Sequence, residues 1–262
     1  MAKIITLFNT KGGCGKSTAA FNLPFVFSSL YGDKSLVIDC DSQCNSSNKL
    51  LAYADKPEYT LYDVICGKDP ALATAKAMVS SRMNTRPKYF NVDCIAADKK
   101  LENANLLKKG NESGFGENLS NFIQDNKYDW VFIDMPPKNQ TLNRIIFKNV
   151  AEYILVPFSS DIDSVTAYND LIEILEEARS HNPALSIMGT YLARYMANCS
   201  VDKDIAGILE GFDDYINCPI PQSSDIKEST YLIKPISFYR PSSKGRIAFE
   251  ELAEHIKKKA KE

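Results

Sequence analysis

The sequence predicts an α/β fold: a doubly wound, mostly parallel sheet with helices on both faces. Short apolar runs such as SLVIDC, WVFIDM and YILVPF alternate with longer helical patterns. Continuous apolar runs of this length are typical of strands that are buried on both faces. The chain has 262 residues, of which 44 % are hydrophobic, and this is enough for the core of one large domain or two small ones. Because no linker divides it, we expect a single domain over residues 1–262, with a surface elaboration at 52–90.

Each predicted element follows from these local patterns. Because strand and helix patterns alternate, right-handed crossover connections should join neighbouring parallel strands. The predicted strands are Lys3–Asn9, Ser35–Cys40, Phe90–Ala96, Trp130–Met135, Tyr153–Phe158, Ile187–Ala193 and Tyr215–Ile220. The predicted helices include Ser17–Tyr31, Ser113–Asn126, Thr141–Val150, Ser164–Ser180 and Ser243–Lys261.

Composition excludes several classes of protein. Lys and Arg number 31 and Asp and Glu 33, which gives a net charge of −2, so a protein whose whole surface is adapted to nucleic acid is excluded, although a local basic face is not. No apolar run reaches the roughly 18 residues of a membrane span, and IITLF near the N-terminus is too short for a signal peptide. We therefore expect a cytoplasmic protein. Cys40 and Cys44 form a close pair but lack the spacing of a common zinc site.

A glycine-rich segment, KGGCGKST, follows the first predicted strand and opens the first predicted helix. It matches the second half of the phosphate-binding pattern Gly-x-x-x-x-Gly-Lys-[Ser/Thr], with Asn9 or Thr10 where the first glycine is expected. Its glycines allow backbone N–H groups to converge on phosphate oxygens, and the helix N-terminus adds further N–H groups. Lys16 should contact the β- and γ-phosphates, and the Ser17 hydroxyl should be a magnesium ligand.

This segment resembles the deviant Walker A motif, KGGxGK[ST], of the ParA/Soj/MinD ATPases. The resemblance implies a P-loop NTPase fold and a site for ATP and Mg²⁺. It also implies an ATP sandwich homodimer, in which Lys11 crosses the interface to contact the phosphates of the partner's ATP, as an arginine finger does in trans. The nucleotide-binding residues of the motif are Lys11, Gly12, Gly13, Cys14, Gly15, Lys16, Ser17 and Thr18.

Two strand ends carry carboxylates that match the same family. The second predicted strand ends in Asp39-Cys40-Asp41-Ser42-Gln43, similar to the family's D-x-D-P-Q, with Ser42 in place of proline. The resemblance assigns Asp41 to the attacking water, and Asp39 to the magnesium shell and a switch segment. Asp134 ends an apolar strand and is followed by Met135-Pro136-Pro137, which is a Walker B pattern for magnesium binding. Acidic residues at the carboxyl ends of strands fit the usual place of α/β sites.

The C-terminal third is similar to the family in IPQSSDIKE, KPI and FYRPSSKG. By resemblance, Pro221 and Gln222 lie at the adenine pocket. Because the phosphate loop begins so near the N-terminus, the short Soj-type form of the family is the nearest match. The C-terminal helix places Phe249, Leu252, Ala253 and Ile256 on one face, and we expect this stripe to pack on the domain and not to bind a membrane.

Family members of the ParA type bind DNA non-specifically as ATP dimers. The basic residues available for such contacts are Lys227, Lys244 and Arg246, with Lys257, Lys258, Lys259 and Lys261 in the tail. The family's arginine after Ile-Pro is Gln222 here, and a further basic position is Asp225. Contacts between lysines and phosphates would give weak, salt-sensitive binding, and nucleoid association would follow from it.

The resemblance therefore implies a dimerising ATPase that acts in plasmid or chromosome partition, with weak basal hydrolysis that a ParB-like activator stimulates. A ParA-like ATPase that positions a cargo other than DNA is the first alternative. An iron–sulfur reductase similar to the nitrogenase iron protein is a second. It would need cysteines that bridge two subunits, and Cys94, Cys199 and Cys218 show no recognisable ligand pattern. A kinase-like small-molecule synthetase would need a specific acceptor pocket.

Overall fold

A computed structural model describes residues 1–79, 88–102, 112–137 and 140–261. The strands among these residues form one sheet of eight, in the order β3-β4-β2-β5-β1-β6-β7-β8. Their bounds are β1 Lys3–Leu7, β2 Ser35–Asp39, β3 Thr74–Val79, β4 Lys88–Ile95, β5 Trp130–Asp134, β6 Tyr153–Ser159, β7 Ser186–Tyr195 and β8 Ile220–Pro221.

All neighbouring strands in this sheet run parallel except β3 and β4, which are antiparallel. The predicted fold class is therefore confirmed. β1 lies at the centre between β5 and β6, and β5 is paired on its other side with β2. The register sets Leu7 opposite Asp134 and Asp134 opposite Asp39. Because parallel strands end at the same edge, the segments that follow β1, β2 and β5 meet there.

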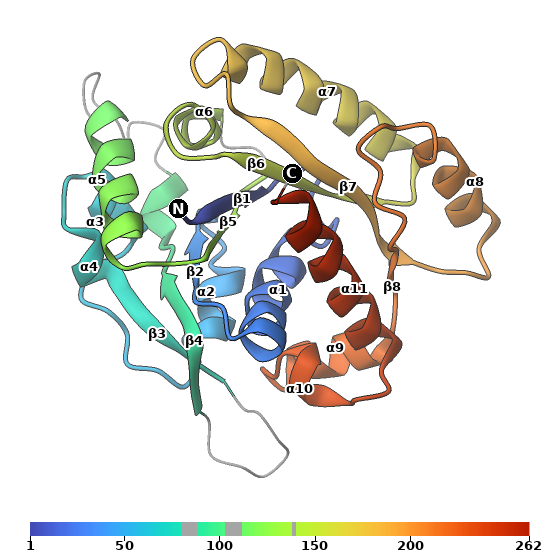
Figure 1. Cartoon of the computed structure of the whole chain (residues 1–262), viewed down its shortest axis with the longest axis horizontal. Coiled ribbons are helices and arrows are strands. Elements are labelled where there is room, and N and C mark those ends of the chain that lie inside the picture. The colour runs from blue at the N-terminus through green and yellow to red at the C-terminus, as the bar shows by residue number, and fades with distance from the viewer. Residues whose placement is uncertain (80–87, 103–111, 138–139, 262) are drawn as a thin grey trace.

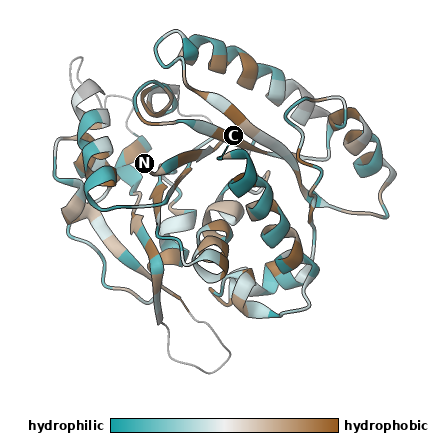
Figure 2. Ribbon diagram, viewed as in Figure 1, coloured by the Kyte–Doolittle hydropathy of each residue, from teal (hydrophilic) through white to brown (hydrophobic). Residues whose placement is uncertain are grey.

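Helices cover both faces of the sheet (Figure 1). α1, α2, α10 and α11 bury apolar side chains against one face, and α3 to α7 bury theirs against the other. Figure 2 shows hydrophobic residues concentrated along the strands and hydrophilic residues on outward turns of the helices. The bounds are α1 Lys16–Tyr31, α2 Asn45–Leu50, α3 Leu61–Ile65, α4 Pro70–Ala73, α5 Glu112–Asp125, α6 Gln140–Asn149, α7 Ile162–Arg179, α8 Ser200–Leu209, α9 Ser224–Tyr231, α10 Ile236–Tyr239 and α11 Lys244–Lys259.

The apolar stripe of α11 is covered, as predicted. Phe249, Leu252, Ala253 and Ile256 are at most 1 % exposed and pack into the core formed with α1. Just beyond the stripe, the Lys257 ammonium lies 2.8 Å from a carboxylate oxygen of Asp33 and 3.6 Å from the centroid of the Tyr31 ring. These contacts fasten the last turns of α11 to the end of α1. In the described part of the chain, no helix combines the length and apolar character needed to cross a membrane.

The predicted strand Tyr215–Ile220 is wrong. Of this segment as the structure describes it, only Tyr215, through an isolated bridge to Thr190, and Ile220, at the start of β8, pair with β7. Two residues interrupt the pairing. Pro219 has no N–H to donate to a neighbouring strand, and the Cys218 N–H donates to the carbonyl of Ile216 in its own segment at 2.7 Å.

The expected elaboration at 52–90 contains α3, α4 and an edge strand, β3, that the apolar pattern did not predict. Residues 80–87 of this segment lie outside the described residues. β3 pairs antiparallel with β4, with a register irregularity between Lys76 and Met78. Irregular pairing of this kind blurs the alternation of buried and exposed positions on which a sequence-based strand prediction depends.

Candidate functional site

The loop between β1 and α1 has a backbone that only glycine adopts with ease. Gly13 and Gly15 have φ values of 77° and 96°, in the left-handed region where a side chain is strained. A Cβ atom at Gly15 would also lie 3.3 Å from the Cβ of Ala193. Asn9 fixes the start of the loop, because its Nδ2 donates to the Pro157 carbonyl at 2.9 Å and its Oδ1 accepts from the Lys11 N–H at 2.9 Å. This role of Asn9 was not predicted from the sequence, although a polar residue directly after an apolar strand was a signal for it.

Lys16 lies at the centre of the loop. Its side-chain ammonium donates to the backbone carbonyls of Asn9 at 2.9 Å and Lys11 at 2.8 Å, and the residue is only 6 % exposed. A cation is thus held where the loop N–H groups and the start of α1 converge. This arrangement supplies the fixed positive charge that a bound polyphosphate requires.

Lys11 is bound within its own chain. Its ammonium forms a short ion pair with Oδ1 of Asp161, the N-cap residue of α7. Burial acts to raise the pKa of Asp161, but hydrogen bonds from Lys11, Ser159 and Ser164 outweigh it, so the pKa lies below its ordinary value. Sequence reasoning missed Asp161, since the pair joins residues 150 positions apart.

Asp39 and Asp134 form a buried acidic pair at the ends of β2 and β5. Both residues are 0 % exposed. Burial, and next the charge of Asp134, raise the pKa of Asp39 to about 7, and burial raises the pKa of Asp134. The Oδ1 atom of Asp134 is buried without a hydrogen-bond partner. Two adjacent carboxylates with an unpartnered oxygen are the donor set that Mg²⁺ prefers, so these residues fit a divalent cation.

Two consecutive serines in α2 hold this acidic pair. Ser46 Oγ donates to Asp134 Oδ2 at 2.6 Å, while Ser47 donates to Asp39 Oδ2 from its N–H at 2.8 Å and from its Oγ at 2.7 Å. Ser47 Oγ also accepts from the Ala97 N–H at 2.9 Å, which ties the end of β4 to the pair. Neither serine was predicted from the sequence.

Asp41 closes its own loop. Its Oδ1 accepts from the Gln43 N–H at 3.0 Å, and the Cys44 N–H donates to the Asp41 carbonyl at 2.8 Å. Cys44 has a φ of 55°, which is rare for a residue with a side chain. The Asp41 side chain thus closes a turn over Ser42, the position at which the family has proline.

A cavity of about 420 Å³ lies beside the loop, between the start of α1 and the segment that follows β8. Pro221 and Gln222 line it together with Thr18 and Arg194, so the structure places these predicted residues next to the phosphate loop. Arg194 has a φ of 60° and donates to the Gly13 carbonyl at 3.3 Å. Lys227, predicted from the sequence as a DNA contact, also lines this cavity.

Comparison with known proteins agrees with the geometry of this site. A model of the AAA_31 family, described as an AAA domain, matches residues 2–187. The chain belongs to this family. It is 26 % identical to the chromosome partitioning protein ParA of Caulobacter vibrioides, over 97 % of this chain and 93 % of ParA. It is 28 % identical to the chromosome-partitioning ATPase Soj of Treponema pallidum, over 98 % of this chain and 97 % of Soj.

A solved structure is similar in fold and in sequence. The septum site-determining protein MinD of Pyrococcus horikoshii, complexed with Mg-ADP, superposes with a TM-score of 0.75 at 26 % identity, covering 99 % of this chain and 98 % of MinD. The resemblance to the ParA/Soj/MinD group of P-loop ATPases, stated above from the sequence alone, is thus confirmed.

The basic residues expected to contact DNA differ in their surroundings. Lys244 is exposed at the start of α11, whereas the guanidinium of Arg246 pairs with Glu250 at 2.7 Å. Asp225, which departs from the pattern of the ParA-type members, pairs with Arg240 at 3.0 Å. The acidic residue therefore has a structural partner, and it lowers the positive charge of this surface.

The cysteines do not form a cluster site in the described part of the chain. Cys94 lies within β4 and Cys218 packs beside α11, and both are at most 2 % exposed. No group of three or more His, Cys, Asp or Glu residues suited to a metal ion occurs among the described residues. Cys94, enclosed in the core between the sheet and its helices, is not placed to bridge two subunits.

Proposed function

We propose that residues 1–262 act as one ATP-dependent switch of the ParA type, in which ATP and Mg²⁺ control dimerisation and a partner protein stimulates hydrolysis. The observation that carries the proposal is the KGGCGKST loop, whose Lys16 ammonium lies among backbone carbonyls and acts electrostatically on Asp134 of the buried acidic pair. Its role would be in DNA partition.

In this proposal the loop from Lys11 to Thr18 binds the phosphates through its backbone N–H groups. Lys16 exchanges the carbonyls of Asn9 and Lys11 for phosphate oxygens, which a flexible ammonium does without moving the backbone. Ser17, Asp39 and Asp134 are the residues that would hold Mg²⁺, which neutralises charge on the phosphates when bound. Pro221 and Gln222 contact the base in the neighbouring cavity.

Asp41 is assigned to orient the attacking water. Among the described residues, its carboxylate accepts one hydrogen bond, from the Gln43 N–H at 3.0 Å, so an acceptor oxygen remains for a water molecule. The gain from such a group lies in orientation more than in proton transfer, because phosphoryl transfer depends mainly on positioning and charge stabilisation.

Dimerisation requires Lys11 to change partners. In the single chain it pairs with Asp161, and in the proposed ATP sandwich homodimer it contacts the phosphates bound by the other subunit. The exchange of one anionic partner for another keeps the lysine charge compensated throughout. A ParB-like activator would act by favouring the second arrangement.

DNA binding follows from doubling a modest basic surface. Lys244 and the tail lysines at 258, 259 and 261 would provide phosphate contacts, whereas Lys257 is paired with Asp33. No element in the described part of the chain is placed to read bases, so binding would ignore sequence and fall steeply as salt rises. Two such surfaces on one duplex bind more tightly than either alone. A protein that binds DNA in this way would associate with the nucleoid. A cargo other than DNA is the alternative if this surface proves inactive.

The test is ATP turnover with Mg²⁺, measured alone, with random duplex DNA, and with the protein encoded next to this one. The proposal predicts slow basal turnover that rises most when both additions are present. Absence of turnover under all of these conditions would refute the ATPase assignment, and turnover indifferent to both additions would refute the partition role.

A further inference from the structure

The hydroxyl of Ser46 is buried against one carboxylate of the acidic pair. Ser46 is 0 % exposed near the start of α2, and its Oγ donates to Asp134 Oδ2 at 2.6 Å. This distance is typical of a strong hydrogen bond from a hydroxyl to a carboxylate. The hydroxyl of Ser17, at the start of α1, also interacts with the Asp134 carboxylate. Asp134 is therefore the point at which α2 meets the helix that follows the phosphate loop.

The contacts of Ser46 differ from those of an ordinary serine in the first turn of a helix. Such a serine commonly caps its own helix, but the N-cap of α2 is Cys44, which forms no side-chain capping bond. Ser47, the next residue, accepts from the Ala97 N–H and so also ties β4 to α2. Among the described residues, the Ser46 hydroxyl is hydrogen-bonded to Asp134 alone. Its contact is thus directed to a residue expected to hold Mg²⁺.

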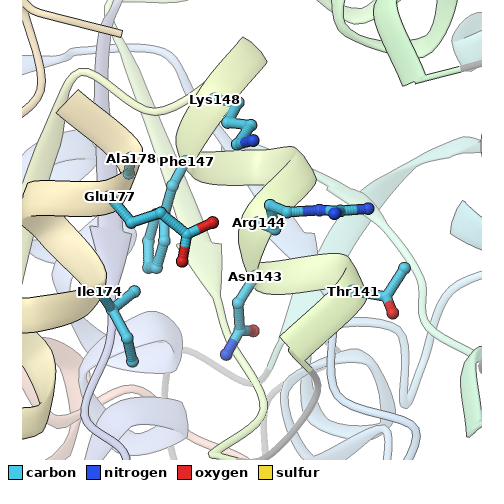
Figure 3. Close-up of a pocket in the computed structure, with 8 residues that line it drawn as sticks. All are labelled: Thr141, Asn143, Arg144, Phe147, Lys148, Ile174, Glu177 and Ala178. Carbon is cyan, nitrogen blue, oxygen red and sulfur yellow. The ribbon is translucent and has the colours of Figure 1, made fainter. Parts of the chain in front are cut away.

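The helix that follows β5 in the chain does not take over this task. α6 begins at Gln140, soon after Asp134. Its polar residues Thr141, Asn143 and Arg144 line a groove of about 400 Å³ between α6 and α7 (Figure 3). In the part of the chain that the structure describes, the hydrogen bond that fixes the Asp134 carboxylate comes from α2.

We propose that Ser46 is a positioning residue that orients the Asp134 carboxylate for Mg²⁺, an inference that rests on the proposed function. Mg²⁺ demands near-ideal octahedral geometry, whereas the larger Ca²⁺ accepts flexible arrangements of oxygen ligands. A buried hydroxyl that holds one carboxylate oxygen restricts rotation of the whole group. The hydrogen bond from Ser46 therefore favours the cation with the stricter geometry.

The same hydrogen bond connects Asp134 to the loop that carries Asp41. That loop is closed by the Gln43 and Cys44 N–H groups, which donate to the side chain and the carbonyl of Asp41, and α2 begins directly after it. Since Ser46 holds the first turn of α2 against the end of β5, it also fixes where this loop ends relative to Asp134.

The experiment is a calorimetric titration of the full-length protein with ADP, in EDTA and at increasing concentrations of Mg²⁺ or Ca²⁺. ADP makes the readout independent of hydrolysis. Ser46→Ala should bind ADP in EDTA within about twofold of the wild type, but the Mg²⁺ concentration that gives half of the gain in ADP affinity should rise about tenfold or more. The corresponding Ca²⁺ concentration should rise by about threefold or less, because Ca²⁺ tolerates a misaligned carboxylate.

The matched control is Ser35→Ala. Ser35 is also 0 % exposed, but it lies at the start of β2, at the opposite end of that strand from Asp39, and its Oγ has no hydrogen-bond partner. This variant removes one buried hydroxyl without touching Asp134. It should match the wild type with EDTA, Mg²⁺ and Ca²⁺.

Three results would overturn the proposal. The first is an unchanged Mg²⁺ requirement in Ser46→Ala. The second is an equal rise for Mg²⁺ and Ca²⁺, which would indicate general loosening of the site. The third is loss of ADP affinity in EDTA, which would make Ser46 part of the fold of the phosphate loop. All three leave the ATPase assignment standing, whereas a wild type whose ADP affinity ignores Mg²⁺ would contradict the proposed function together with this inference.

Discussion

Replacing Asp39 by asparagine should stabilise the nucleotide-free protein at high pH. Burial raises the pKa of Asp39 to about 7, against 3.8 for an exposed aspartate. The folded state therefore keeps a proton that the unfolded chain has lost, and the stability associated with it is present below pH 3.8 and lost as the pH rises through about 7. Asp39→Asn removes this titration.

The magnitude follows from the linkage between pH and unfolding. Each pH unit inside that window lowers the free energy of unfolding by about 1.4 kcal/mol, so the wild type should lose about 3 kcal/mol between pH 5 and pH 8 through this carboxyl. The variant gives up one hydrogen bond, since its amide nitrogen cannot accept from the Asp41 N–H. That loss, about 1 kcal/mol, does not depend on pH.

The assay is urea unfolding of both proteins at pH 5 and pH 8, without nucleotide or Mg²⁺. The stability of the variant relative to the wild type should rise by about 3 kcal/mol between the two pH values. Asp125→Asn, on the exposed surface of α5, is the control for loss of an aspartate charge alone. An Asp39→Asn difference that is the same at both pH values would refute the account of a protonated, buried acidic pair.

Three further predictions concern the proposed function. Lys16→Ala should abolish ATP binding in calorimetry, because it removes the cation at the β- and γ-phosphates; affinity within about tenfold of the wild type would contradict this. Asp41→Ala should bind ATP but release no phosphate, since only the orientation of water is lost, and wild-type phosphate release would disprove the assignment. Lys244→Glu should reduce retention of ATP-bound protein on random duplex DNA at low salt, while Lys203→Glu on α8 serves as the control. Equal retention of both variants would remove Lys244 from the DNA surface.

The parts of the site that were predicted from the sequence are those whose functional residues form short contiguous motifs at the ends of strands. KGGCGKST, Asp39 and Asp134 each follow an apolar strand, and parallel strands end at one edge, so the order of strands and helices along the chain is enough to predict that they converge. Pro221 was placed by resemblance, and the structure brings it to the cavity beside Gly15.

The parts that were missed depend on contacts between distant segments. Asp161 becomes relevant only because α7 starts next to the phosphate loop, and Ser46 only because α2 lies over the end of β5. Serines and aspartates near helix starts are common as caps, so their residue type alone does not distinguish a cap from a ligand-positioning group. The edge strand β3 was missed for a related reason, since its pairing with β4 is irregular.

The central claim is that nucleotide controls assembly, and sedimentation velocity of Asp41→Ala tests it most directly, because slow hydrolysis keeps ATP bound during the run. The account predicts monomers without nucleotide and with ADP, and dimers with ATP and Mg²⁺. It further predicts that Lys11→Ala combined with Asp41→Ala shifts the ATP state back toward monomer. The same sedimentation coefficient in the apo, ADP and ATP states would contradict a nucleotide-controlled switch.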